Sequence, residues 1–164
     1  ASSSGEEAYT LAMVLADLLG RAEWEILGTD ISTRVLERAR KGLYPIERAQ
    51  TIPKDFLQRF CLKGQDRHLG LFLMNRQIRE RVTFTHANLC QPLPRLGPFD
   101  VAFLRNVLIY FDVPQKRRVV EAVMRQVKPG GLLFVGHSES LTGICEGLEP
   151  IRPTVYRVAM AGRG

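Results

Sequence analysis

Apolar side chains near the start of the chain recur every three or four residues, as on one face of an amphipathic helix. This spacing predicts a helix over Glu6–Leu19, and Gly20 directly after it is a stop signal. Further helices are predicted over Thr33–Arg40 and Pro114–Val127, with a short one over Lys54–Phe60. The helical patterns are separated by short apolar runs that have no helical spacing.

Those apolar runs indicate strands. Phe99–Leu104 is apolar apart from Asp100, a pattern typical of a strand that is covered on both faces. Pro129-Gly130-Gly131 is predicted to be a tight turn before the strand Leu132–Val135, and the alternating segment Thr154–Val158 predicts an edge strand. The other predicted strands are Trp24–Leu27, Leu69–Met74 and Arg81–His86. Strands that alternate with helices favour an α/β domain with a mainly parallel sheet.

One stretch, at about 44–81, interrupts this alternation. Pro45 and Pro53 break it, and Lys63-Gly64-Gln65-Asp66 is a turn signal. The stretch is too long for a simple connection between a helix and a strand. We therefore predict one domain over 1–164 that carries a small β-subdomain insertion with its own hairpin.

The small-residue turn Ser2–Gly5 runs straight into the first helix, and Asp30 closes the next strand. In a Rossmann-like crossover such a pair holds an adenosine, because small residues let the backbone approach the ligand and the acid accepts hydrogen bonds from the ribose hydroxyls. There is no G-x-G-x-x-G motif. Glu6 and Glu7 stand where a pyrophosphate would need an open helix N-terminus, so the site favours a cationic ligand such as the sulfonium of S-adenosylmethionine (SAM).

Asp30 and Glu7 also have purely structural interpretations. Asp30 is a favoured helix N-cap residue, and a glutamate such as Glu7 in the first helical turn stabilises the helix dipole. A ligand-binding turn ordinarily follows a strand, so we expect the chain to begin just after the first, central strand of its fold.

Two other strand ends carry candidate binding residues. Asn88 follows a strand directly and suits an adenine edge, with a turn residue before Pro92 as the equal alternative. Arg105 ends a buried strand at the edge where ligands bind in open α/β sheets, and its guanidinium suits a carboxylate. Tyr110 could donate a hydrogen bond to that carboxylate and flank a sulfonium, whereas a structural arginine and a packed aromatic pair are the alternative. The segment His137–Ser140 lacks a nucleophile elbow, which favours a pocket-wall or structural role.

Composition narrows the possible partners. The chain has 164 residues, of which 45% are apolar and 24% charged, and no run approaches the roughly 20 apolar residues of a membrane span. Three scattered cysteines without a C-x-x-C pair, and three histidines without ligand spacing, argue against a metal site and favour the cytoplasm. The net charge is +6, but the basic clusters lack interleaved aromatic residues, so no nucleic-acid partner is predicted.

The motifs together resemble a known family, the CheR-type chemotaxis receptor glutamate methyltransferases of bacteria. The resemblance covers nearly the whole chain and is carried by Ala1–Tyr9, Gly28–Ile31, Phe99–Phe111 and Leu132–Ser140. It implies a Rossmann-like class I SAM-dependent methyltransferase fold, with SAM as cofactor and S-adenosylhomocysteine as product. The implied reaction forms methyl esters on glutamate side chains in the cytoplasmic domain of methyl-accepting chemotaxis receptors.

The resemblance also implies roles for individual residues. Tyr110 and Arg105 would be catalytic, with Tyr110 near the transferred methyl group. Glu7 would contact the methionyl part, Asp30 the ribose, and Asn88 with Leu89 the adenine. The pocket would be lined by Leu104, Arg105 and Asn106.

Enzymes of that family carry an N-terminal helical domain that we do not find in this sequence, which leaves a non-catalytic receptor-docking or SAM-binding module as the alternative function. Two other classes fit less well. A nicotinamide-dependent oxidoreductase would need the glycine fingerprint. In a nucleic-acid amino-methyltransferase an Asn/Asp-Pro-Pro-aromatic motif would stand in place of Arg105-Asn106-Val107.

Overall fold

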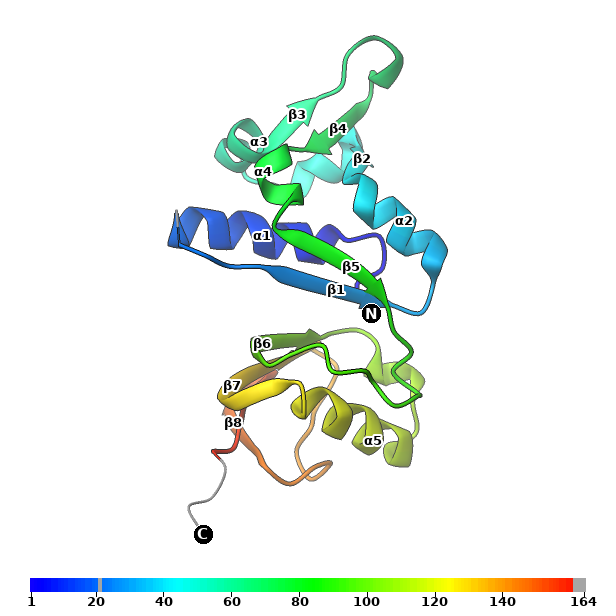
Figure 1. Ribbon diagram of the computed structural model, residues 1–164, viewed down its shortest axis with the longest axis vertical. Helices are drawn as coiled ribbons and strands as arrows, with labels where there is room; N and C mark the ends of the chain where they lie inside the picture. The colour runs from blue at the N-terminus through cyan, green and yellow to red at the C-terminus, as the bar shows by residue number, and fades with distance from the viewer. Residues whose placement is uncertain (21, 161–164) are drawn as a thin grey trace. The chain divides into compact units, whose positions relative to one another are not determined.

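The first helix, α1, has the ends that the apolar spacing predicts, Glu6–Leu19. Gly20 closes it with a positive φ, and its N–H bonds to the carbonyl of Ala16. The computed structural model describes residues 1–20 and 22–160 (Figure 1). Within it the chain divides into two units, Ser2–Ala87 and the part from Asn88 onward, and each is described by itself.

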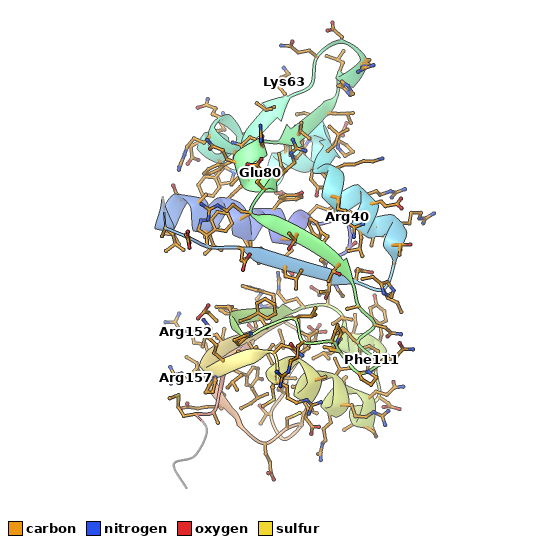
Figure 2. All side chains as sticks on the ribbon, viewed as in Figure 1. Arg40, Lys63, Glu80, Phe111, Arg152 and Arg157 are labelled. Carbon is orange, nitrogen blue, oxygen red and sulfur yellow. The ribbon has the colours of Figure 1, made fainter. Side chains whose placement is uncertain are left out.

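In the first unit, two parallel strands place Asp30 at a sheet edge. β1 (Ile26–Asp30) and β5 (Val82–His86) pair over five residues, ending with Asp30 opposite His86. The pair packs against α1 and α2 (Thr33–Lys41) (Figure 1). From α2, Arg40 donates a hydrogen bond from Nη2 to the carbonyl oxygen of Phe84 at 2.9 Å (Figure 2).

The same unit contains a separate antiparallel sheet between α2 and β5. Its order is β2-β4-β3, so the hairpin predicted for this stretch is present as β3 and β4. The bounds of an inserted subdomain stay a prediction. The elements of this stretch are β2 (Leu43–Pro45), η1 (Ile46–Thr51), α3 (Lys54–Phe60), β3 (Cys61–Lys63), η2 (Asp66–His68), β4 (Leu71–Met74) and α4 (Arg76–Arg79).

An aromatic cluster forms the core of the first unit. The ring of Tyr9 meets those of Tyr44 and Phe84 edge-on, at centroid distances of 6.1 and 5.8 Å. Both tyrosine hydroxyls donate to backbone oxygens, Tyr9 to Ala39 at 2.9 Å and Tyr44 to Ser4 at 2.7 Å. Burial raises the pKa of Tyr9 to about 12 and that of Tyr44 further still.

We expect this cluster to make the first unit sensitive to alkali. The unfolded chain loses the Tyr9 proton near pH 10, its ordinary pKa, but the folded chain holds it to about pH 12. The free energy of unfolding should therefore be unaffected by this group below pH 10 and fall between about pH 10 and 12. Tyr9→Phe should cost about 1 kcal/mol at pH 7 for the lost hydrogen bond but flatten the alkaline decline. Urea unfolding of the wild type and Tyr9→Phe at pH 7, 9 and 11 measures this. An equal fall in the free energy of unfolding between pH 9 and 11 in the two proteins would contradict the prediction.

The second unit is built on a sheet of four strands in the order β6-β7-β9-β8. β6 (Phe99–Leu104) and β7 (Val127–Val135) are parallel, whereas β9 (Val155–Val158) and β8 (Leu148–Arg152) add antiparallel pairings. Between β6 and β7 lie η3 (Leu108–Tyr110) and α5 (Val113–Met124), and the side chain of Asp112 caps α5. None of the described helices is long and apolar enough to cross a membrane.

Three predicted boundaries in this unit are wrong. Pro129-Gly130-Gly131 is not a turn before the strand but part of β7, where the pairing with β6 jumps from Phe99↔Val127 to Val101↔Leu132. The strand therefore begins at Val127, and α5 ends before it. The segment Val155–Val158 is not at the edge, because β8 pairs along its outer side. All three errors come from pairings between distant segments, which local sequence patterns do not reveal.

Candidate functional site

In the first unit, the N-terminal turn is tied directly to the end of β1. The N–H of Ser3 donates to Asp30 Oδ2 at 2.9 Å, and the N–H of Ser2 donates to the carbonyl of Thr29 at 2.6 Å. The other oxygen, Asp30 Oδ1, accepts from the N–H of Ser32 at 3.0 Å. Because each carboxylate oxygen has two lone pairs, both can still accept a further donor.

These bonds bear on the competing interpretation of Asp30. The N-cap of α2 is Ser32, so Asp30 lies two residues before the cap and is not the cap itself. Its side chain is half-buried at the carboxyl end of a parallel strand. The turn and the acid, which the sequence predicted as a pair, are thus brought together by a hydrogen bond.

Acidic side chains mark the start of α1. The Ser4 hydroxyl donates a hydrogen bond shared between the two carboxylate oxygens of Glu6, at 2.8 and 3.0 Å. The Glu6 carboxylate also lies 3.9 Å from the guanidinium of Arg48. Glu7 is half-buried in the same turn of helix. This helix N-terminus therefore suits a sugar diol and a cationic group and disfavours a diphosphate.

The reason for glycine at position 5 differs from the expected one. Gly5 is buried with a φ of 92°, and an added Cβ would lie 2.9 Å from Ala39 Cβ and 3.0 Å from the Phe84 ring. On the side where a Cβ would stand, the position is therefore filled by the core of the unit. The atoms that come close to Gly5 are protein atoms of the core. The link between the turn and Asp30 is made by the backbone N–H of Ser3.

In the second unit, the segment after β6 carries the residues predicted to be catalytic. Arg105 is half-buried where the strand ends, and Asn106 has a positive φ of 56°. Leu108 is buried at the start of η3, whereas Tyr110 at its end is 77% exposed. A packed aromatic pair therefore does not describe this segment, because only Phe111 packs against the core of the unit.

Other residues predicted to bind the cofactor also lie in the second unit, where they make contacts within the protein. Asn88 Oδ1 accepts from the N–H of Cys90 at 2.9 Å, as the turn interpretation expects. Leu89 is half-buried against the core of the unit. Leu104 is 3% exposed within that core. Within the described residues, no group of three or more His, Cys, Asp or Glu could hold a metal ion.

Glu139 lies in His137–Ser140, for which the sequence predicted a pocket-wall or structural role, but its link to the segment after β6 was not predicted. Its carboxylate is buried in the second unit and accepts hydrogen bonds from backbone amides of the segment after β6. Glu139 and these amide donors lie more than 30 positions apart in the sequence. The one local sign is Gly136 three residues earlier, where an added Cβ would lie 2.5 Å from Glu139 Oε2.

Residues 1–156 match the family described as CheR methyltransferase, SAM binding domain. The chain belongs to this family. Its fold is accordingly that of the SAM-binding domain of CheR methyltransferases, and SAM is the cofactor of that domain. The α/β fold and the cofactor expected from the motifs are confirmed, and each unit contains a parallel strand pair.

Proteins named chemotaxis protein methyltransferase are similar over nearly all of this chain. The one from Salmonella typhimurium is 38% identical over 162 residues, covering 97% of this chain and 56% of that protein. The one from Klebsiella aerogenes is 40% identical over 161 residues, covering 95% and 55%. Chemotaxis protein methyltransferase 2 of Pseudomonas aeruginosa is 36% identical, covering 97% and 58%. The chain thus spans a little over half the length of these relatives.

Proposed function

We propose that this chain is the SAM-binding part of an enzyme that methylates glutamate side chains of chemotaxis receptors. Membership of the CheR family and relatives named chemotaxis protein methyltransferase support the reaction class. The observation that carries the cofactor site is the hydrogen bond from Ser3 N–H to Asp30 Oδ2, which fixes a carboxylate beside an acidic helix start. Because the proposed substrate is the receptor's cytoplasmic domain, the proposal includes a cytoplasmic location for the protein.

Two acids of the first unit would hold the cofactor. Asp30 would accept hydrogen bonds from both ribose hydroxyls through the lone pairs that Ser3 and Ser32 leave open. Glu7 would accept from the ligand's amine and compensate its positive charge. In the second unit, the residues proposed to bind the cofactor are Asn88, Leu89, Leu104, Arg105 and Asn106.

The segment after β6 would orient the substrate. SAM, when bound, supplies an electrophilic methyl group. A glutamate carboxylate is already ionised near pH 7, so the reaction needs no general base. Arg105 would hold that carboxylate by its guanidinium, and the Tyr110 hydroxyl would direct one oxygen toward the methyl group. The products are the glutamate methyl ester and S-adenosylhomocysteine.

Calorimetry and a transfer assay together test the proposal. S-adenosylhomocysteine should bind the chain and NAD should not, because the acidic start of α1 opposes a diphosphate. With labelled SAM, the chain should transfer label to glutamates of a chemotaxis receptor's cytoplasmic domain. Binding of NAD alone would contradict the cofactor. Binding of S-adenosylhomocysteine without transfer would instead favour a SAM-binding or receptor-docking module.

A further inference from the structure

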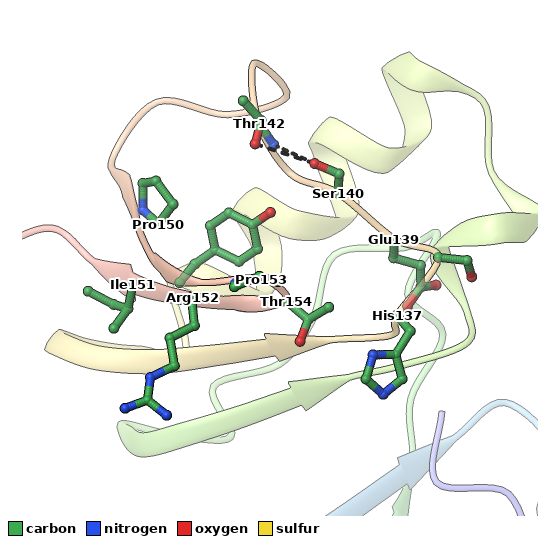
Figure 3. A pocket seen from close by; sticks show the side chains of 11 residues that line it. His137, Glu139, Ser140, Thr142, Pro150, Ile151, Arg152, Pro153 and Thr154 are labelled. Carbon is green, nitrogen blue, oxygen red and sulfur yellow. Dashed lines mark hydrogen bonds between the residues drawn. The ribbon is translucent and has the colours of Figure 1, made fainter.

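One buried carboxylate organises the segment that carries the proposed catalytic residues. Glu139 is 6% exposed and is the one buried charged residue in the part of the chain that the structure describes. It lies in the short segment after β7 and reaches toward the segment after β6 (Figure 3). A carboxylate is costly to bury unless hydrogen bonds replace its water shell, so its partners are informative.

Four backbone amides surround this carboxylate. Oε1 accepts from the N–H groups of Val107 at 3.0 Å and Leu108 at 2.7 Å. Oε2 accepts from those of Asn106 at 2.9 Å and Gly136 at 2.7 Å. Three of the donors are consecutive residues, an arrangement of amides that forms a nest for an anion. The left-handed backbone of Asn106 turns its amide toward the same carboxylate as its neighbours.

Besides Glu139, turn hydrogen bonds hold the segment after β6, from the N–H of Tyr110 to the carbonyl of Val107 at 3.2 Å and from the N–H of Phe111 to that of Leu108 at 3.1 Å. Leu108 is anchored in the core at 1% exposure, but Ile109 and Tyr110 are 51% and 77% exposed. Arg105 and Tyr110 flank the three amides directly, on either side in the sequence. Glu139 therefore holds part of the backbone from which these two side chains leave.

We propose that Glu139 is a positioning residue for methyl transfer, one that fixes the backbone from Asn106 to Leu108 so that Arg105 and Tyr110 meet the substrate in one geometry. It does not touch the substrate or the cofactor. This inference rests on the proposed function, in which the segment after β6 orients the glutamate carboxylate. A displacement of about 1 Å in such a group lowers turnover about 100-fold.

Glu139→Gln tests the anchor without changing the volume of the side chain. The amide nitrogen of glutamine would face two backbone N–H groups and accept from neither. Hydrogen exchange should accelerate about 10- to 100-fold at the amides that lose their acceptor, which are either Val107 and Leu108 or Asn106 and Gly136. Exchange at Leu133 in β7 should stay as in the wild type, because the sheet is intact. Glu149→Gln is the matched control, because Glu149 forms an exposed ion pair with Arg157. It should change hydrogen exchange neither in the segment after β6 nor at Leu133.

The order of two variants separates positioning from packing. If Glu139 acts through its carboxylate, the shorter Glu139→Asp should retain more turnover than Glu139→Gln, for which about a 100-fold loss is expected. If Glu139 only fills space, the isosteric glutamine should be the more active of the two. A Glu139→Gln variant that is more active than Glu139→Asp overturns the inference. Unchanged hydrogen exchange at Asn106–Leu108 in Glu139→Gln also overturns it.

The transfer assay distinguishes this inference from the proposed function. A wild-type chain that neither binds S-adenosylhomocysteine nor transfers methyl groups would contradict the proposed function, and with it this role of Glu139. An active wild type whose Glu139→Gln variant turns over equally fast would contradict the positioning role alone.

Discussion

Replacing Asp30 by asparagine should weaken binding of S-adenosylhomocysteine about 10- to 100-fold. The expected loss corresponds to the roughly 1.5–3 kcal/mol by which a hydrogen bond to a charged group exceeds no bond. Asparagine keeps one oxygen acceptor but presents an amide nitrogen where the ribose or the Ser3 N–H needs an acceptor. Isothermal titration calorimetry measures the dissociation constant directly.

Asp100→Asn is the matched control for this measurement. Asp100 is 80% exposed and pairs with Lys128 at 2.7 Å, a surface pair worth at most about 1 kcal/mol. Its variant should therefore bind S-adenosylhomocysteine as the wild type does. A urea unfolding curve for each variant shows whether it is folded at the assay temperature. A folded Asp30→Asn protein with wild-type affinity would remove Asp30 from the proposed cofactor site.

Replacing Phe84 by alanine should lower the free energy of unfolding by about 3–5 kcal/mol, the usual cost of removing a buried aromatic ring. The ring is 8% exposed and lies against two glycines, Gly5 in the N-terminal turn and Gly28 on the neighbouring strand. An added Cβ would come within 3.0 Å of it at Gly5 and 2.6 Å at Gly28. Without the ring, both glycines border a cavity, and the turn that carries Ser3 loses its support.

Phe84→Leu keeps much of the volume and should cost about 1–2 kcal/mol. Urea unfolding followed by circular dichroism gives both values. Equal stability of the wild type and Phe84→Ala would show that the turn does not depend on the ring. The alanine variant should also bind S-adenosylhomocysteine more weakly, because its Ser3 amide no longer holds Asp30 in place.

Local patterns predicted the elements whose ends are set by nearby residues. α1 has both expected ends, because the apolar spacing and Gly20 lie within a few residues of them. β6 likewise follows its apolar run from Phe99 to Leu104. The strands β7 and β9 differed from prediction, since their extent and place depend on which distant strand pairs with them.

The candidate site shows the same division. The pairing of the N-terminal turn with Asp30 could be predicted, because residue types at a strand end and in a turn indicate ligand chemistry. The structural reason for Gly5 could not, since Phe84 and Ala39 reach it only in the folded unit. The part played by Glu139 was equally hidden, because its amide donors come from a segment about 30 residues earlier.

The way Glu139 is bound also bears on how this protein can change. Its carboxylate meets main-chain N–H groups, which every amino acid except proline possesses. The exposed side chain of Ile109, directly after these donors, can therefore change while the backbone anchor beside it persists. A lineage could in this way acquire a different acceptor preference through point substitutions, without rebuilding the loop itself.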